Sequence, residues 1–297
     1  MQIISAPTRL VILPPSSVVA PRAFRNIRID NGEYDFLLAG MQRLRGSVYL
    51  SDGAITADEL TPRGSHEQPE DTRSWHVLAV DEQDQVRGCL RYMEERETSD
   101  FEDLWISNTA LARCPAWGAR FRRSVEAERV RARRLHLSFG VVGGWAVAED
   151  RRCSVEALRI ILATYALLEL LGGCLGLATA TVRHGSAGIL RRIGLSSLMV
   201  DGQEVPPYYD PRYRCEMEAL RFDSAFPNAK YHNAVQELCS LLATAPVICR
   251  KNAEIERQDS RERVATPVLR RLTVPAGLQV LAGPKPAIAD LLQPVAG

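Results

Sequence analysis

The chain has 297 residues, 46% of them hydrophobic and 25% charged, which is the composition of a globular protein with a sizeable core. Its 37 Lys and Arg residues balance 36 Asp and Glu residues, and the net charge of +1 gives no general attraction to nucleic acid or membranes. The seven cysteines are odd in number and never spaced as CxxC, so they favour neither a disulfide framework nor a zinc site.

The two ends of the chain differ in composition from its middle. Four prolines predict a flexible lead-in over residues 1–22, and five prolines without periodicity predict a disordered tail over residues 249–297. Residues 23–248 would then form the folded domain. No export signal is readable, and the most apolar segment, residues 160–171, falls short of the roughly 20 residues that a membrane span needs. We therefore expect no membrane span and a cytoplasmic location.

Periodicity predicts a strand, a helix and a hairpin in the first part of this domain. Residues 24–30 alternate as a strand does, and residues 34–48 carry apolar side chains at helical spacing. Two apolar runs, residues 75–80 and 86–92, are joined by four polar residues, which is typical of a β-hairpin. The sheet should therefore begin with antiparallel strands.

A strand between two helices is predicted next. Residues 118–134 form an arginine-rich helix, and its glutamates can pair with the arginines at helical spacing, which favours a solvated face. Residues 139–148 suit a buried strand. Ser154 is then a candidate N-cap for a long helix that Gly172 and Gly173 would end. The order strand, polar turn, helix is the most informative part of the pattern.

The remaining segments complete an α+β fold. The pattern predicts a strand at residues 175–182, a helix at 186–193, a second meander across 197–200 and 214–222, and an amphipathic helix at 229–243. We expect three layers, with a mixed, largely antiparallel sheet flanked by helices.

The polar turn after the strand at residues 139–148 is suited to binding an anion. A helix N-terminus carries about half a positive charge and unpaired N–H groups, and this turn adds two arginines. We predict a pyrophosphate site there, formed by Arg151, Arg152 and the Ser154 amide, and we include the neighbouring Val147 and Cys153 among the residues that bind the co-substrate. Coenzyme A or the phosphopantetheine arm of a carrier protein would suit it, and a solvated turn without a ligand is the alternative. A dinucleotide has no support, because GxGxxG is absent.

Three segments resemble the core of the GNAT superfamily of acyltransferases. They are GGWAVAEDRR at residues 143–152, LATATVRHGS at residues 177–186 and LRRIGL at residues 190–195. Within that superfamily the chain resembles the acyl-homoserine-lactone synthases and the bacterial N-acyl amino acid synthases, over about residues 24–224. Their Arg-x-x-Val-Phe signature is similar to Arg45, Val48 and Tyr49, their acidic position to Asp71, and their Gly-Cys-x-Arg strand to Gly88, Cys89, Leu90 and Arg91.

This resemblance implies a mechanism as well as a fold. A thioester donor would lie in a V-shaped gap where two adjacent strands splay apart, and the strand ending near Val147 would offer N–H groups to the thioester carbonyl. The amine would attack that carbon directly, with no covalent enzyme intermediate. The co-substrate would be acyl-CoA or acyl carrier protein, and the acceptor a small-molecule amine. No metal and no tightly bound cofactor are implied.

Two departures from the family pattern bear on the product. The lactone synthases carry Glu-x-x-Arg on the strand where this chain has Val-Val-Gly-Gly at residues 141–144, which argues against a homoserine lactone. Many GNAT acetyltransferases have a tyrosine as general acid where this chain has Leu190. We therefore expect an N-acyltransferase that moves a long-chain acyl group to an amino acid. A short-chain acetyltransferase and a non-catalytic module that binds an acyl thioester remain alternatives.

Five residues are candidates for binding or deprotonating the acceptor. His184 is a candidate base because a near-neutral imidazole suits amine deprotonation, and a helix-capping histidine is the alternative. Asp71 is a second candidate base, or a partner for the substrate ammonium, although it lies in a polar loop. A planar guanidinium binds a carboxylate at two points, so Arg45, Arg91 and Arg183 are candidates for clamping an amino acid. For each arginine the alternative is a surface or helix-capping role.

Overall fold

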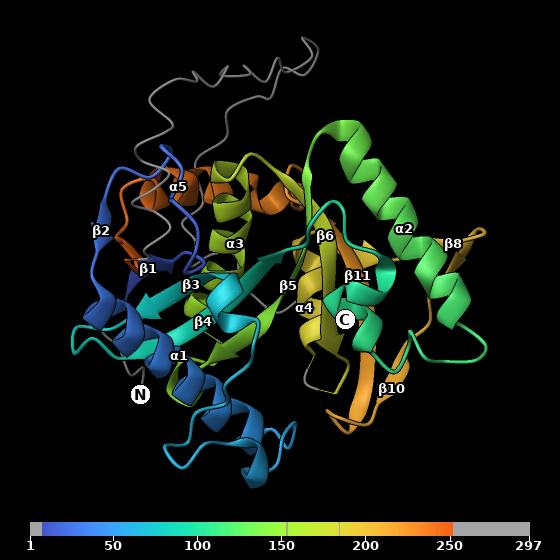
Figure 1. Ribbon diagram of the computed structural model, residues 1–297, viewed down its shortest axis with the longest axis horizontal. Helices are drawn as coiled ribbons and strands as arrows, with labels where there is room; N and C mark the ends of the chain where they lie inside the picture. Colours follow the sequence, from blue (N-terminus) through green and yellow to red (C-terminus); the bar gives the residue numbers. More distant parts are fainter. Residues whose placement is uncertain (1–7, 153, 184, 252–297) are drawn as a thin grey trace. The chain divides into compact units, whose positions relative to one another are not determined.

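A large mixed sheet organises the domain in the computed structural model, which describes residues 8–152, 154–183 and 185–251 (Figure 1). The strand order is β10-β11-β6-β5-β4-β3-β1-β12-β2, and β7 pairs with β11 beside this path. The strands are β1 (Arg9–Leu13), β2 (Ile27–Ile29), β3 (Trp75–Val80), β4 (Val86–Glu94), β5 (Ser138–Val147), β6 (Cys174–Thr181), β7 (Ser196–Ser197), β10 (Tyr208–Asp210), β11 (Cys215–Asp223) and β12 (Val247–Cys249). A separate two-stranded sheet joins β8 (Met199–Val200) to β9 (Gln203–Glu204).

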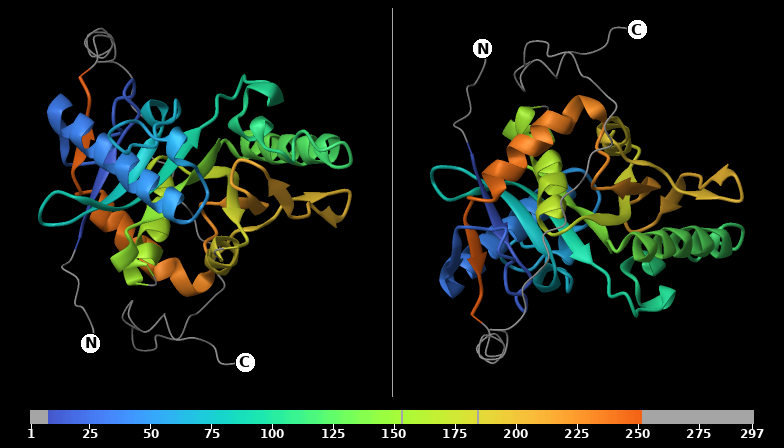
Figure 2. Two further views of the ribbon diagram at one scale, coloured as in Figure 1. Left: turned by 90° about the horizontal axis from the view of Figure 1, so that it is seen from below. Right: turned by 90° about the horizontal axis from the view of Figure 1, so that it is seen from above.

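Helices cover both faces of the main sheet. They are α1 (Asn31–Ser51), α2 (Gly118–Leu135), α3 (Val155–Leu170), α4 (Ser186–Ile193) and α5 (His232–Leu242). In the edge-on views α1 and α2 lie on one face of the sheet, and α3, α4 and α5 lie on the other (Figure 2). Most neighbouring strands are antiparallel, whereas β5–β6, β1–β12 and β12–β2 are parallel. The predicted α+β fold with a mixed, largely antiparallel sheet is confirmed.

Local sequence signals account for the helix ends. Asp30 caps α1 by accepting a hydrogen bond from the Glu33 N–H at 2.9 Å. Ser154 caps α3 as expected, because its hydroxyl accepts from the Glu156 N–H at 3.1 Å. The chain leaves α3 through Gly172 and Gly173, whose φ angles of 101° and 94° suit glycine. These contacts fix α3 between the turn at residues 149–154 and strand β6.

The two faces of β4 meet different helices. Cys89 packs in a buried cluster with α1 residues such as Leu37 and Met41. The adjacent Gly88 points to the opposite face, where a Cβ atom would lie 2.1 Å from Ile160 of α3. Glycine at position 88 therefore allows α3 to approach the sheet closely, and this part of the Gly-Cys-x-Arg segment has a packing role.

Two sequence expectations fail at the limits of this domain. Residues 9–13, expected in a flexible lead-in, form β1, which pairs with β3 over its whole length and has four of its five residues buried. Such a short strand beside prolines has too few residues for periodicity to reveal it. Cys249, expected in the tail, ends β12. The rest of that predicted tail, residues 252–297, lies outside the described residues.

Candidate active site

Strands β5 and β6 run together for only half of their length. They pair in parallel from Ser138 with Cys174 to Val142 with Ala178, and beyond this point the described residues of the two strands do not pair with each other. β5 stays on β4 but gains one residue there, because Arg91 faces Gly143 whereas Cys89 faces Ala146. Such a β-bulge bends a strand away from its neighbour. The two strands therefore enclose a V with its vertex at Val142 and its mouth at Val147.

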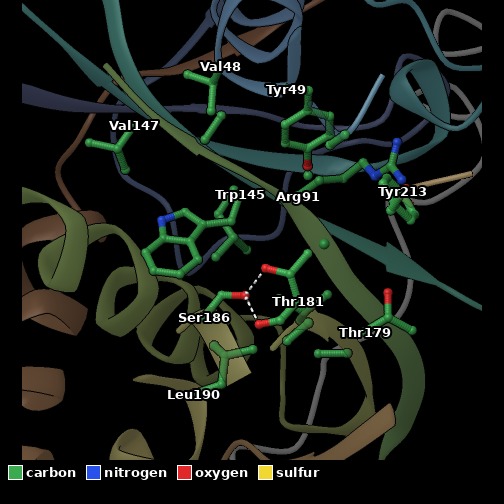
Figure 3. A pocket seen from close by; sticks show the side chains of 18 of the residues that line it. Val48, Tyr49, Arg91, Trp145, Val147, Thr179, Thr181, Ser186, Leu190 and Tyr213 are labelled. Atoms are coloured by element: carbon green, nitrogen blue, oxygen red, sulfur yellow. Dashed lines mark hydrogen bonds between the residues drawn. The ribbon is translucent and has the colours of Figure 1, made fainter. Parts of the chain in front are cut away.

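A cavity of about 390 Å³ fills this V and has the size of a small-molecule site (Figure 3). Both faces of the sheet contribute to it, since Val48 and Tyr49 reach it from α1, and Ile189 and Leu190 reach it from α4. The cavity therefore passes through the sheet. A molecule held along β5 would be open to a second molecule arriving on the α1 face.

A buried ionic cluster, defined here as Arg45, Asp71 and Arg91, stands beside the α1 side of the cavity. Arg45 binds the Asp71 carboxylate at two points, with distances of 2.8 and 2.7 Å from its two terminal nitrogens. Arg91 Nη1 lies 3.0 Å from Asp71 Oδ1. Gln42 Nε2 and the backbone N–H of Gln68 donate to Oδ2 at 3.0 and 3.1 Å. The Asp71 carboxylate thus accepts hydrogen bonds from five N–H donors.

This environment keeps Asp71 ionised. Burial alone would raise its pKa, but the hydrogen bonds from Arg45 and the charges of Arg45 and Arg91 hold the pKa well below its usual range. A carboxylate with so low a pKa and such fully used oxygens is a poor base. These contacts favour a role for Asp71 in positioning two arginines, and its role as a base or as a partner for the substrate ammonium stays a prediction.

The three candidate arginines have different surroundings. Arg45 is 0% exposed and is not among the residues that line the cavity, which favours a role through Asp71, and its contact with substrate stays a prediction. Arg91 does line the cavity, and its Nη1 also donates to Gln68 Oε1 at 2.8 Å. Arg183 is exposed and is not among the residues that line the cavity. Of the three arginines predicted to clamp the substrate carboxylate, Arg91 is the one that lines the cavity.

His76 adds a neutral member to this region. Its Nε2 lies 2.7 Å from the backbone oxygen of Asp71, which can only accept, so Nε2 carries the proton. Complete burial, together with the charges of Arg91 and Arg45, lowers the pKa of His76 to about 4. At neutral pH the two guanidinium groups and one carboxylate therefore leave one positive charge beside the cavity.

The predicted anion-binding turn lies at the mouth of the V. Val147 and Arg152 line the cavity, and Arg152 Nη1 is 2.8 Å from Asp52 Oδ1. Arg151 is buried with its Nε 3.5 Å from an oxygen of Asp150. The Ser154 hydroxyl donates to the Arg151 carbonyl at 2.5 Å, which ties the turn to the start of α3. Two predicted residues, Cys153 and His184, lie outside the described residues.

Sequence reasoning missed several residues of the cavity wall. The Tyr49 hydroxyl points into the cavity toward Arg91, and Tyr213 lies on the same side (Figure 3). Burial raises the pKa of both phenols, so each keeps its proton at neutral pH and can donate a hydrogen bond. Tyr49 could have been predicted from the sequence, because the family signature has an aromatic residue, phenylalanine, at that position. Tyr213 and Trp105 could not, since the sequence does not show that their segments reach the V.

The described part of the chain offers neither a metal site nor a membrane-spanning helix. Within residues 8–152, 154–183 and 185–251, no three His, Cys, Asp or Glu side chains are grouped so that they could hold a metal ion. Among the helices of these same segments, none combines the length and the apolar character needed to cross a bilayer.

Among the comparisons with known proteins, matches come only from solved structures. No family model and no curated protein matches the chain. It is similar to the CoA-dependent acyl-homoserine lactone synthase BjaI with MTA, at 12% identity and a TM-score of 0.49, over 85% of this chain and 99% of that one. It is also similar to FeeM, an N-acyl amino acid synthase from uncultured soil microbes, at 14% identity and a TM-score of 0.40, over 73% and 92%. A putative N-acetyltransferase from Lactobacillus plantarum matches at 11% identity and a TM-score of 0.39, over 73% and 99%. These are the kinds of protein that the sequence motifs resemble.

Proposed function

We propose that this chain is an N-acyltransferase that moves a long-chain acyl group from acyl-CoA or acyl carrier protein to the amine of an amino acid or a similar small molecule. The cavity between β5 and β6 is the observation that carries the proposal. A strand alternates its N–H groups between its two neighbours, so those on the β6 side of residues 143–147 face the gap. Donors fixed in this way stabilise the oxyanion of an attacked thioester.

The donor would enter at the mouth of the V. Arg152 lines the cavity there, and the N-terminus of α3 follows directly. A helix N-terminus with adjacent arginines favours a phosphate or pyrophosphate group. We assign the phosphate-bearing end of the donor to Val147, Arg151, Arg152, Cys153 and Ser154, and its thioester to the bulge at Gly144 and Trp145.

The acceptor would approach from the α1 face. The ionic cluster leaves one positive charge there, and of its two arginines only Arg91 lines the cavity. A substrate carboxylate would neutralise this charge, and a guanidinium is suited to binding it. The Tyr49 hydroxyl, which points toward Arg91, would donate a further hydrogen bond. An amino acid held in this way would have its amine close to the bulge in β5.

The reaction forms one bond and breaks one. The amine nitrogen attacks the thioester carbonyl carbon, the C–N bond forms, and the C–S bond breaks with its electron pair leaving on sulfur. The amine proton passes to His184 or to water, and the thiolate is protonated by solvent, because Leu190 offers no proton where it lines the cavity. The protein supplies positioning and hydrogen-bond donors.

Purified protein would test the proposal directly. It would be incubated with acyl-CoA or acyl carrier protein of several chain lengths and with mixed amino acids, and N-acyl products would be sought by mass spectrometry. A long-chain N-acyl amino acid is expected, and Arg91→Gln should raise the acceptor KM more than the donor KM. Preference for acetyl-CoA would instead favour a short-chain acetyltransferase. Tight acyl-CoA binding without turnover of any amine would favour a non-catalytic module.

A further inference from the structure

The closed end of the cavity differs in character from the rest of its wall. Five of the lining residues belong to this end: Met93, Trp105, Val141, Val142 and Ala178. Val142 and Ala178 are the last pair of β5 with β6, and Met93 pairs with Val141. Trp105 donates its backbone N–H to Glu95, whose own N–H donates to the Phe139 carbonyl in β5. All five lining residues are apolar, whereas Gln68 and Arg91 lie on the α1 side, and Asp52 and Arg152 lie at the mouth. The vertex therefore suits a hydrocarbon, since a charged or strongly polar group would lose hydration there without gaining a partner.

The direction of the V places a long acyl chain at this end. β5 covers about 7–10 Å between the bulge at Gly144 and Trp145 and the vertex at Val142, at about 3.3 Å per residue. A donor with its phosphate at the mouth and its carbonyl at the bulge points its acyl chain toward the vertex. Beyond Val142 the pairing of β5 with β6 closes the space between the strands. A longer chain must therefore press against the residues that cap the vertex.

Trp105 is the bulkiest of these residues and is firmly held. It begins a short helix, Trp105–Asn108, in the segment between β4 and α2. Its neighbours Leu104 and Ile106 are both 0% exposed in the core beneath α2, against which the Trp105 ring packs. Its backbone N–H donates to Glu95 Oε1 at 3.0 Å. Because the residues before and after Trp105 are buried, its ring is held in a fixed position at the cavity wall.

We propose that Trp105 limits the length of the acyl chain by closing the vertex of the cavity. This inference rests on the proposed acyl-thioester function and adds a determinant of donor specificity. Each buried methylene contributes about fourfold to binding, because about 0.8 kcal/mol corresponds to that ratio. Replacing the indole ring with a methyl group should therefore favour a donor that is two or more methylenes longer.

A chain-length series tests this inference. The kcat/KM and the Kd of acyl-CoA donors with even-numbered chains would be measured for the wild type, Trp105→Ala and Trp105→Leu. In Trp105→Ala the preferred chain should lengthen by two to four carbons, with a gain of about 16-fold for a donor two carbons longer relative to the wild-type optimum. Trp105→Leu should shift the preference less and keeps the test available if Trp105→Ala fails to fold.

Trp117 provides a matched control. It packs against the same core beneath α2 but does not line the cavity. Trp117→Ala should leave the chain-length preference unchanged. An equal loss for all donors in both Trp105 variants would overturn the inference, because it would show a structural role only. Length-dependent binding that shifts in the Trp105 variants, without turnover of any amine, would refute the acyltransferase but keep the inference. Failure of the wild type to bind any acyl-CoA or any acyl carrier protein would overturn both.

Discussion

The ionic cluster and the mouth of the V use the same residue types in opposite ways. In the cluster, Arg45 is 0% exposed and Asp71 accepts five hydrogen bonds within the protein. At the mouth, the Arg152 side chain is 36% exposed and is paired with Asp52, whose side chain is 22% exposed. A buried ion pair cannot lose one member cheaply, whereas an exposed arginine can exchange a carboxylate for a ligand phosphate. The buried charges therefore hold each other's side chains in position, whereas the arginine at the mouth can exchange its protein partner for a ligand.

The largest effect is expected from breaking the cluster. Asp71→Asn leaves two guanidinium groups without their carboxylate in a buried site, and we expect the free energy of unfolding to fall by about 3–5 kcal/mol. Urea denaturation at neutral pH measures this change. The matched exposed variant Asp52→Asn removes the partner of Arg152 and should change the free energy of unfolding by no more than about 1 kcal/mol. Equal decreases in the free energy of unfolding of Asp71→Asn and Asp52→Asn would contradict the distinction between the buried cluster and the mouth of the V.

The cluster should also make stability depend on pH through His76. Burial lowers its pKa to about 4, whereas the unfolded chain has a pKa of about 6.5, so the unfolded state binds the extra proton between these values. Stability is then present above pH 6.5 and is lost as the pH falls toward 4. We expect a loss of about 2–3 kcal/mol between pH 7 and pH 4.5.

His76→Gln should remove most of this dependence. The glutamine amide can still donate to the Asp71 backbone oxygen but does not titrate. Some dependence should remain, because burial and the charge of Arg45 also lower the pKa of His66. Thermal or urea unfolding at several pH values compares the two proteins. Parallel curves from pH 7 to pH 4.5 would show that His76 is not the titrating group.

The smallest effect on stability is expected at the mouth. Arg152→Ala should raise the KM for acyl-CoA about 5-fold and weaken its dependence on ionic strength, with a change in the free energy of unfolding of at most about 0.5 kcal/mol. Steady-state kinetics at two salt concentrations measure this. Arg183→Ala, which removes an exposed arginine away from the cavity, is the control and should match the wild type. An unchanged KM in Arg152→Ala would remove Arg152 from the donor site.

Most local elements of the fold were predictable from the sequence. The β3–β4 hairpin, helix α2 and the capped helix α3 each carry their signal within one short segment, as periodicity or as a capping residue. Strand β1 did not, because five residues between prolines show no period. The order of strands in the sheet depends on pairing between distant segments, which no local pattern records.

The candidate site was predictable in composition but not in arrangement. Family motifs pointed to Arg45, Asp71 and Arg91 separately, yet only the fold shows that Asp71 is saturated by its arginine partners. The low pKa of Asp71 follows from that contact and favours a positioning role over the predicted role as a base. Trp105 could not be predicted as a cavity residue, because it reaches the cavity from a connecting segment whose path depends on the whole sheet.

The position of β1 affects how the chain folds during synthesis. Val11, Ile12 and Leu13 are fully buried, and one edge of their strand can be covered as soon as β3 has been made. The other edge pairs with Val247, near the end of the described domain. At about 5–20 residues per second, the ribosome needs roughly 10–50 seconds to make the intervening chain. During this time an apolar strand has an open edge, so a chaperone that covers residues 9–13 would protect the nascent protein from aggregation.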